Sequence, residues 1–303
     1  MSSVSGIRLV GGTPPPVAPA IMPAGPAVNP HVKVWTMDGK QGKELPVDLS
    51  TINEGGDVIA QTAYQNAGKV DDFLRSRFGR NGWDNRGAAL EVVVHAPGDD
   101  GRPMNNAFWD REKHKIYLGD GDGRIFAPLG GALDVLTHET VHAVVDSEVK
   151  LQYKGQQGGI NESWADVIGS LNDPDKDWLI GEDVFTPGTP GDAIRDLAAP
   201  RYSNVKQITP GSDVEVHDLS GIPSLAAVRV ADKIGRDQMG SIWYRALCDH
   251  LDSRAGFSGA ARATLQSAID LFGQRSPQFA AVSDAWKSVG VNARFPAKVA
   301  LKP

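Results

Sequence analysis

The chain has 303 residues, a length typical of about two domains. Of these residues 41% are hydrophobic and 22% charged, which is typical of a globular protein. Its formal net charge is −6 and it contains no block of Lys and Arg, so a nucleic acid or an anionic membrane surface is disfavoured as a partner. Because Cys248 is the single cysteine, an internal disulfide framework and a cysteine-rich metal site are both excluded, and a metal would have to bind histidines and carboxylates.

Residues 1–31 are rich in Pro, Gly, Ala and Val and have no helical or strand period, which predicts an extended or disordered arm. The arm lacks a charged segment followed by an uninterrupted apolar one, so it does not fit a standard signal peptide. No apolar run approaches the ~20 residues of a membrane span. The sequence therefore fits a cytosolic protein, a protein exported by another route, or a chain without its leader.

Residues 32–150 combine helical and strand signals. Apolar side chains recur every three and four residues from Gly56 to Arg80, which predicts a long amphipathic helix. Short strands separated by Gly and Asp turns are then predicted at 89–97, 105–110 and 114–123. With a further helix at 133–149, these elements predict an N-terminal α+β domain.

Residues 151–303 are predicted to form a second, mainly helical domain. The Gly-containing segment QYKGQQGG is expected to be a loop before a helix at 161–171. Helical periodicity then marks four more segments, 225–236, 239–251, 259–272 and 277–289. No internal repeat of 20 to 50 residues is evident.

The segment LTHETVHAVV places two histidines four residues apart in the predicted 133–149 helix. Positions i and i+4 share one helix face, so His138 and His142 can direct their imidazoles at one ion while Glu139 reaches water beside it. This is the HExxH pattern of zinc sites. The alternative is that both histidines are satisfied core residues.

A catalytic zinc site needs a third protein ligand and an open position for water. Glu162 follows His142 by 20 residues and lies on the next predicted helix, with Asp166 one turn further along the same face. Glu162 could complete the ligand set, and Asp166 could accept the second ring N–H of a ligand histidine. The competing interpretation is that both carboxylates belong to a solvated helix face.

Several motifs in order resemble the thermolysin-like family of zinc endopeptidases, and within it the group with short precursor segments, represented by protealysin. These motifs are NNAFWD, YLGDGDG, LDVLTHETVHAVV, GGINESWADVIG, DWLIGEDVFTPGTPGDAIRD and VHDLSG, spread over most of residues 32–295. The resemblance implies a two-domain α+β fold with an active-site cleft between the mixed N-terminal domain and the helical C-terminal domain. It also implies a zinc-dependent peptidase.

The resemblance assigns a role to each matching position. It implies that His138, His142 and Glu162 bind zinc and that Glu139 is the general base. Tyr153 and His217 are similar to the pair that stabilises the oxyanion, and Arg195 to the arginine that binds the carbonyl beside the scissile bond. Either Asp213 or Glu215 would orient His217. Asn106 and Ala107 resemble the edge strand that binds the peptide backbone.

The remaining matched residues concern specificity and a second metal. The resemblance implies a pocket for a large hydrophobic side chain after the scissile bond, lined by Phe126, Leu129, Val135, Ile180, Val184 and Ile194. Acids that bind calcium in the family correspond to Asp134, Asp173, Asp177 and Glu182. Because the chain is about four residues shorter here and Leu179 replaces an expected acid, we predict one Ca²⁺ rather than two. The alternative is that these acids cap turns.

The family also suggests partners and a location. Peptides or proteins would be the substrates, and a monomer is expected. Secretion is implied by the resemblance although no signal peptide is visible, with a cytoplasmic location as the alternative. Residues 1–31 would be either a short precursor segment or a linker.

Two other functions fit the sequence less well. A zinc aminopeptidase would need acidic residues to anchor a free amine, and no stretch like GxMEN is present. A zinc-containing binding module without catalysis would not need to retain Glu139, Tyr153, His217 and Arg195 together. The sequence therefore favours a zinc endopeptidase that prefers hydrophobic residues on the leaving-group side.

Overall fold

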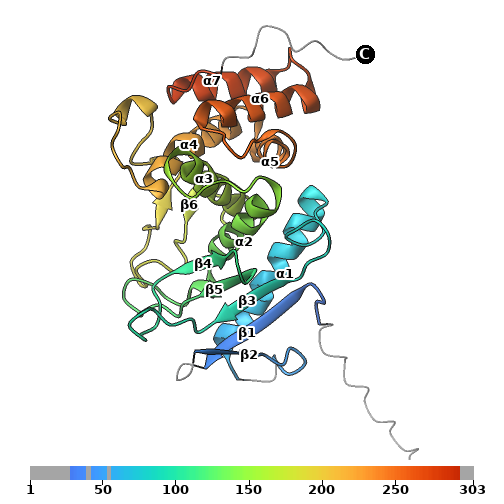
Figure 1. Cartoon of the computed structure of the whole chain (residues 1–303), viewed down its shortest axis with the longest axis vertical. Coiled ribbons are helices and arrows are strands. Elements are labelled where there is room, and N and C mark those ends of the chain that lie inside the picture. Colours follow the sequence, from blue (N-terminus) through green and yellow to red (C-terminus); the bar gives the residue numbers. More distant parts are fainter. Residues whose placement is uncertain (1–27, 39–41, 53–55, 294–303) are drawn as a thin grey trace, which may run out of the picture.

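The computed structural model describes residues 28–38, 42–52 and 56–293. Most of the predicted arm, residues 1–27, lies outside this part of the chain. The described residues form a lower half built on a β-sheet and an upper half built of helices (Figure 1).

The lower half contains a five-stranded sheet in the order β2-β1-β3-β5-β4. The strands are β1 (Val32–Asp38), β2 (Lys43–Pro46), β3 (Leu90–Val94), β4 (Ala107–Asp110) and β5 (Lys115–Leu118). The central strands β1, β3 and β5 are parallel, whereas β2 and β4 are antiparallel edge strands. The three strands predicted from sequence are confirmed but shorter, and β1 and β2 were not predicted.

Helix α1 (Val58–Phe78) packs against β1 and β3, and its ends follow from the sequence. The Asp57 side chain accepts a hydrogen bond from the Ala60 N–H at the N-cap, and Gly79 adopts a left-handed conformation at the C-cap. Buried alanines, Val70 and Leu74 on one face of α1 meet the sheet, which confirms the predicted amphipathic helix.

Helices α2 (Leu133–Glu148) and α3 (Gly155–Asn172) link the two halves (Figure 1). Helix α3 begins six residues before the predicted start, so the expectation that 152–159 is a loop was wrong from residue 155 onward. The helix starts earlier because of its packing against another helix. A Cβ at Gly158 would lie 2.4 Å from Val216 Cγ1, and one at Gly159 would lie 2.8 Å from Leu219 Cβ, so these glycines allow close packing against the next helix.

The upper half consists of α4 (Val216–Ile234), α5 (Arg236–Arg245), α6 (Phe257–Phe272) and α7 (Pro277–Ser288). A π-helical turn, η3 (Ala246–His250), extends α5, and short 3₁₀ turns are η1 (Leu129–Gly131) and η2 (Val205–Gln207). A two-stranded sheet, β6 (Leu179–Ile180) with β7 (Arg195–Asp196), lies beside the junction. The predicted α+β architecture is confirmed.

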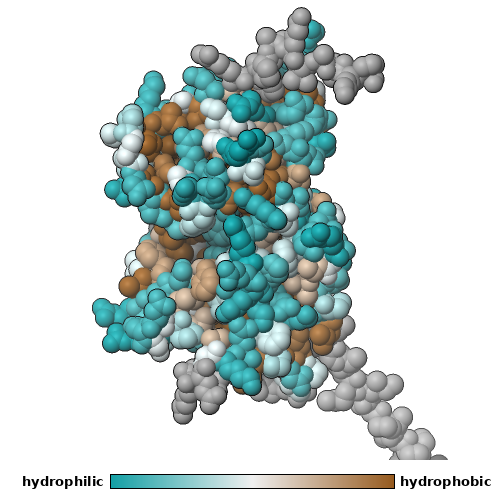
Figure 2. Space-filling model, viewed as in Figure 1, coloured by the Kyte–Doolittle hydropathy of each residue, from teal (hydrophilic) through white to brown (hydrophobic). Residues whose placement is uncertain are grey.

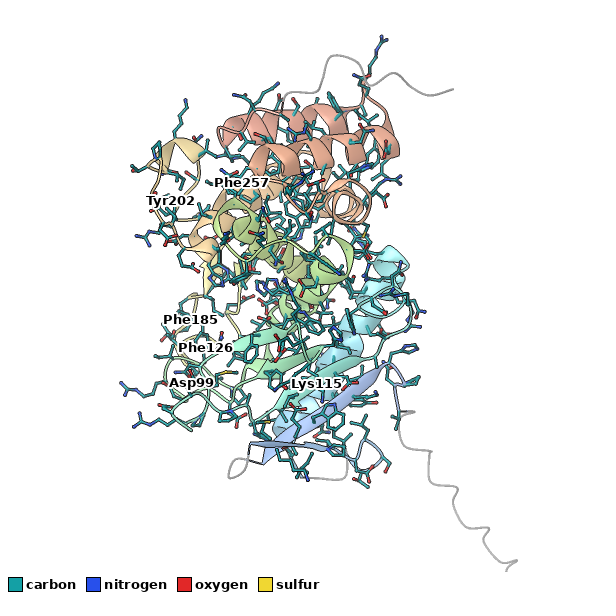
Figure 3. The ribbon with its side chains drawn as sticks, viewed as in Figure 1. Asp99, Lys115, Phe126, Phe185, Tyr202 and Phe257 are labelled. Atoms are coloured by element: carbon teal, nitrogen blue, oxygen red, sulfur yellow. The ribbon has the colours of Figure 1, made fainter. Side chains whose placement is uncertain are left out.

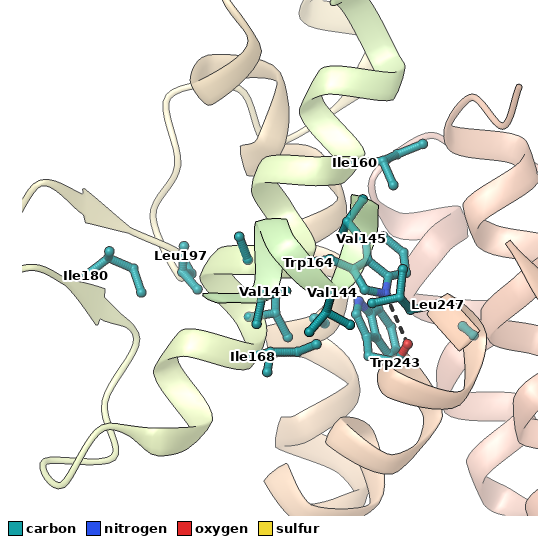
Figure 4. Packing of buried hydrophobic residues seen from close by; sticks show 14 of the residues in the cluster. Val141, Val144, Val145, Ile160, Trp164, Ile168, Ile180, Leu197, Trp243 and Leu247 are labelled. Atoms are coloured by element: carbon teal, nitrogen blue, oxygen red, sulfur yellow. Dashed lines mark hydrogen bonds between the residues drawn. The ribbon is translucent and has the colours of Figure 1, made fainter. Parts of the chain in front are cut away.

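Stacked tryptophans fix α3 within the helical half. Trp164 is fully buried, its Nε1 donates to the Trp243 carbonyl at 3.0 Å, and the two indoles stack at 6.0 Å between centroids (Figure 4). Val141, Val144 and Val145 of α2 pack into the same core. Helices α2 and α3 are therefore held together by one hydrophobic core.

The outline of the molecule narrows between the two halves, and hydrophobic residues lie on the surface next to this narrowing (Figure 2). Within residues 28–38, 42–52 and 56–293, no helix has both the length and the apolar character needed to cross a bilayer.

Candidate metal centre and active-site cleft

A cleft of about 510 Å³ lies where β4, α2, α3, β6–β7 and the start of α4 meet. Its lining includes the residues predicted to bind zinc, to take part in catalysis or to bind the substrate backbone, which are Asn106, Ala107, His138, Glu139, His142, Tyr153, Glu162, Arg195 and His217. Segments far apart in sequence thus supply one site.

Three predicted ligands converge in this cleft. His138 Nε2 and His142 Nε2 are 3.0 Å apart. His138 Nε2 lies 3.4 Å from Glu162 Oε2, and His142 Nε2 lies 3.4 Å from Glu162 Oε1. Their ligand atoms all fall within 4.8 Å of one another, as one ion would require. Two imidazoles and a carboxylate are the donor set of many catalytic zinc sites.

The chemistry of these groups also fits a cation. Glu162 is fully buried, and its Oε2 has no hydrogen-bond partner among the described residues. Burial opposes the ionised form of Glu162, yet the neighbouring His142 and His138 hold its pKa well below its usual range. Burial would also lower the pKa of His138, but Asp166 and Glu162 outweigh it and raise that pKa to about 10. The cluster therefore stabilises a positive charge between the rings.

The second ring nitrogen of each histidine has a partner of its own. His138 Nδ1 lies 2.8 Å from Asp166 Oδ1, and His142 Nδ1 lies 2.9 Å from the amide oxygen of Asn161. These contacts leave both Nε2 atoms directed at Glu162 and fix the ring orientations. Asp166 has the position predicted for it, whereas Asn161 was missed.

Asp166 also holds the predicted substrate-binding arginine. Arg195 Nε and Nη2 donate to the two oxygens of Asp166 at 2.9 and 2.7 Å, a bidentate pair. Burial would raise the pKa of Asp166, but the charge of Arg195 and the contact with His138 lower it. Asp166 thus stays ionised and links Arg195 to the histidine cluster.

Glu139 lies beside the cluster and is held by the edge strand. Its Oε2 accepts a 3.0 Å hydrogen bond from the backbone N–H of Trp109 in β4. Glu139 is 7% exposed and lines the cleft, so its carboxylate can still reach a reacting group.

Tyr153 and His217 approach the cluster at Glu162. The Tyr153 hydroxyl donates to Glu162 Oε1 and lies 3.4 Å from His217 Nε2. His217 Nδ1 lies 2.8 Å from Glu215 Oε1, so Glu215 rather than Asp213 is the acid beside this ring. Burial and the charge of Glu162 raise the pKa of Tyr153, so the hydroxyl remains a donor at neutral pH.

An apolar wall occupies the end of the cleft near the start of α2. Its lining comprises Phe126, Leu129, Val135, Ile180 and Ile194. Phe126 lies next to Phe185, with ring centroids 5.5 Å apart (Figure 3). Val184, which was also predicted to line this pocket, is not among its lining residues, and its carbonyl accepts a hydrogen bond from the Ala127 N–H.

Three of the four acids predicted to bind calcium come together between α3 and β6. Asp173, Asp177 and Glu182 offer oxygens within 4.8 Å of one another. Asp173 Oδ2 and Glu182 Oε2 are buried without hydrogen-bond partners in the described part of the chain. The fourth, Asp134, is outside this group, and its Oδ2 accepts a 2.5 Å hydrogen bond from the Gly181 N–H.

Sequence reasoning missed one further group in the cleft, Arg111 and its partner Asp146. Arg111 follows the edge strand, and Asp146 lies one turn after His142 on α2. The i, i+4 spacing of His142 and Asp146 was a signal for a shared helix face, but nothing in the sequence indicated that Arg111 would reach it.

Comparison with known proteins places this geometry in a class. A model of the thermolysin metallopeptidase catalytic domain matches residues 32–146, and a model of the thermolysin metallopeptidase alpha-helical domain matches residues 149–291. The two matches follow one another along the chain and together cover most of the described residues.

Individual relatives agree. The chain is 40% identical over 278 residues to bacillolysin of Brevibacillus brevis, covering 85% of this chain and 51% of that protein. It is 41% identical over 229 residues to extracellular elastase of Staphylococcus epidermidis, covering 73% of this chain and 44% of that protein. The chain spans about half the length of the curated relatives it matches.

A solved structure extends the likeness to three dimensions. The precursor of protealysin, a metalloproteinase from Serratia proteamaculans, superposes with a TM-score of 0.75 at 33% identity, covering 86% of this chain and 87% of that one. The chain belongs to the thermolysin metallopeptidase family.

Proposed function

We propose that the chain is a zinc-dependent endopeptidase that cleaves peptide bonds before large hydrophobic residues. The observation that carries the proposal is the convergence of His138, His142 and Glu162 in an open cleft with Glu139 beside them. These three residues would hold the zinc. When bound, zinc polarises a carbonyl and makes water acidic enough to ionise near neutral pH.

Glu139 is the proton carrier in this proposal. Its carboxylate accepts the proton of the attacking water and transfers it to the amine that leaves. The Trp109 N–H keeps one carboxylate oxygen in place for both transfers. Since the peptide nitrogen must gain a proton before its bond to carbon breaks, loss of this carboxylate would stop turnover without removing a metal ligand.

Tyr153 and His217 would stabilise the negative charge that develops on the carbonyl oxygen. Both present donors beside Glu162, and Glu215 would keep the His217 imidazole oriented toward the cleft. Removal of one such donor typically costs about 3 to 4 kcal/mol of transition-state stabilisation. Arg195, fixed by Asp166, would bind the substrate carbonyl next to the scissile bond.

Substrate orientation would come from the edge strand and the apolar wall. Asn106 precedes β4, and Ala107 is its first residue. Strand β4 is an edge strand of the five-stranded sheet, so its backbone groups can pair with an extended peptide. The wall from Phe126 to Ile194 would take the hydrophobic side chain on the leaving-group side.

We further propose that one Ca²⁺ binds Asp173, Asp177 and Glu182. Oxygen ligands of this kind suit calcium, and the two buried oxygens without partners support a cation there. Asp134 would not bind the ion itself, but its carboxylate would add negative charge near the site. Acidic residues that only cap turns would not need two buried oxygens left without donors.

Peptides or proteins are the proposed substrates, and a monomer is the proposed state. We propose action outside the cell, supported by the name of the extracellular elastase to which the chain is similar.

The test is cleavage of an internally quenched peptide blocked at both ends, with Phe or Leu after one bond. We expect cleavage that a zinc chelator abolishes and added zinc restores. Blocked ends separate an endopeptidase from an aminopeptidase, and full activity in the chelator would contradict the zinc mechanism.

A further inference from the structure

Arg111 lies at the end of the cleft opposite the apolar wall. Helix α2 forms the floor, with Val135 on the wall, the HETVH residues in the middle, and Asp146 beside Arg111. Val135 and Asp146 are 11 positions apart, or about 16 Å along the helix axis. If the apolar wall takes the leaving-group side of a substrate, Arg111 faces the acyl side.

The acid at this end, Asp146, already accepts three hydrogen bonds. Arg111 Nη2 donates to Asp146 Oδ1, while Asp146 Oδ2 accepts from Arg111 Nε at 2.8 Å and from Trp109 Nε1 at 2.9 Å. The Asp146 side chain is only 11% exposed. It is therefore poorly placed to accept a hydrogen bond from a basic substrate side chain.

The guanidinium of Arg111, in contrast, has N–H donors that are not engaged within the described residues. The Arg111 side chain is 55% exposed, and within the described residues its Nη1 has no hydrogen-bond acceptor. Nη2 has one further contact, at 3.4 Å, with the Leu151 carbonyl. Because Asp146, itself held by Trp109, binds the guanidinium at the cleft, the two Nη1 hydrogens are presented without further ordering of a long side chain.

We propose that Arg111 is a specificity-determining residue that selects an acidic side chain on the acyl side of the scissile bond. This inference rests on the proposed endopeptidase function. A carboxylate accepts two N–H donors, a carboxamide oxygen accepts them without the charge, and an ammonium group accepts none. The expected order of preference is Glu, then Gln, then Lys.

The experiment uses blocked, internally quenched peptides with Leu after the scissile bond. Glu, Gln, Lys or Ala is placed at the first or the second residue before that bond. We expect kcat/KM for Glu to exceed that for Lys by roughly two- to fivefold at one of these positions, as for an exposed ion pair, and to shrink toward equality at high salt.

Three variants of the full chain identify the residue responsible. Arg111→Ala should abolish the preference, and Arg111→Lys should keep part of it because charge remains without the fork of donors. Lys113→Ala is the matched control, because Lys113 is a cation on the same hairpin that instead contacts Glu44 and the Tyr117 ring and does not line the cleft. It should keep the full preference.

The ratio between peptides is measured within each variant, so a smaller folded fraction does not alter it. A Glu preference that survives in Arg111→Ala, or equal cleavage of all peptides by the unmodified protein, would overturn the role of Arg111 while leaving the proposed function intact. No cleavage of any peptide, including the Ala parent, would overturn the proposed function and this inference with it.

Discussion

At the scale of single residues, the site depends on side chains whose second polar atom is already engaged. His138 contacts Asp166, His142 contacts Asn161, and Glu139 accepts from the Trp109 N–H. Each contact removes rotational freedom that metal or substrate binding would otherwise have to restrict. The ligand atoms are thus positioned by the protein itself.

His217 allows the oxyanion role to be tested apart from zinc binding. We predict that His217→Ala lowers kcat by about 10²-fold while zinc content is unchanged, because a donor to the developing charge is lost but no ligand. Steady-state kinetics and metal analysis would be done on the same preparation. His250→Ala is the control, since His250 pairs with Asp270 at a distance from the cleft lining. A loss confined to KM, or loss of zinc, would contradict the assignment.

The sequence was informative at this scale where spacing within one helix decides geometry. The i, i+4 pairs His138 with His142 and Glu162 with Asp166 fall on shared faces as the helical period requires. Contacts made by the fold could not be predicted this way. Arg111 reaches Asp146 across 35 positions, and Glu215 rather than Asp213 meets His217 because Glu215 is the N-cap of α4.

At the scale of elements, packing overrode local propensity in one place. The glycines of the expected loop at 152–159 joined α3 because only a residue without Cβ fits against Val216 and Leu219. Strand β1 was missed for a different reason, because its sequence VKVWTMD has the β-branched and aromatic residues and the alternation of a strand but follows directly on the predicted arm. The long helices were predicted because their apolar periodicity is local.

The acidic groups around the proposed calcium site give a prediction that depends on pH. Burial and the charges of neighbouring acids raise the pKa of Asp134 to about 6 and the pKa of Glu182 to about 7. Unfolded carboxyl groups lose their protons near pH 4, so between about pH 4 and 7 these two groups bind more protons in the calcium-free native state than in the unfolded state. Their contribution to stability therefore falls as pH rises through this window.

Calcium should reverse this loss by replacing the protons. We predict that the increase in Tm caused by calcium in zinc-loaded protein is larger at about pH 7 than at about pH 5, as scanning calorimetry would measure. Glu182→Gln should reduce the increase, whereas Asp175→Asn, an exposed acid outside the ligand group, should not. An unchanged Tm at about pH 7 would refute the calcium site.

At the scale of the whole molecule, the metal centre lies at the junction of two halves with different cores. Glu139 is tied to the edge strand of the sheet, while Glu162 lies on α3, which is packed by Trp164 into the helical half (Figure 4). The cleft is thus formed by both halves, and its polar residues meet only when α2 and α3 pack together. The site therefore forms only when the two halves have folded and packed together.

The central claim is that Glu162, and not Glu139, completes the metal site. The most direct measurement is zinc content by mass spectrometry of the native protein, compared between Glu162→Gln and Glu139→Gln at the same free zinc concentration. These variants make the same chemical change at two buried glutamates of one cleft. We predict one zinc per chain in Glu139→Gln, as in the unmodified protein, and its loss from Glu162→Gln. Equal zinc content in both variants would contradict the account.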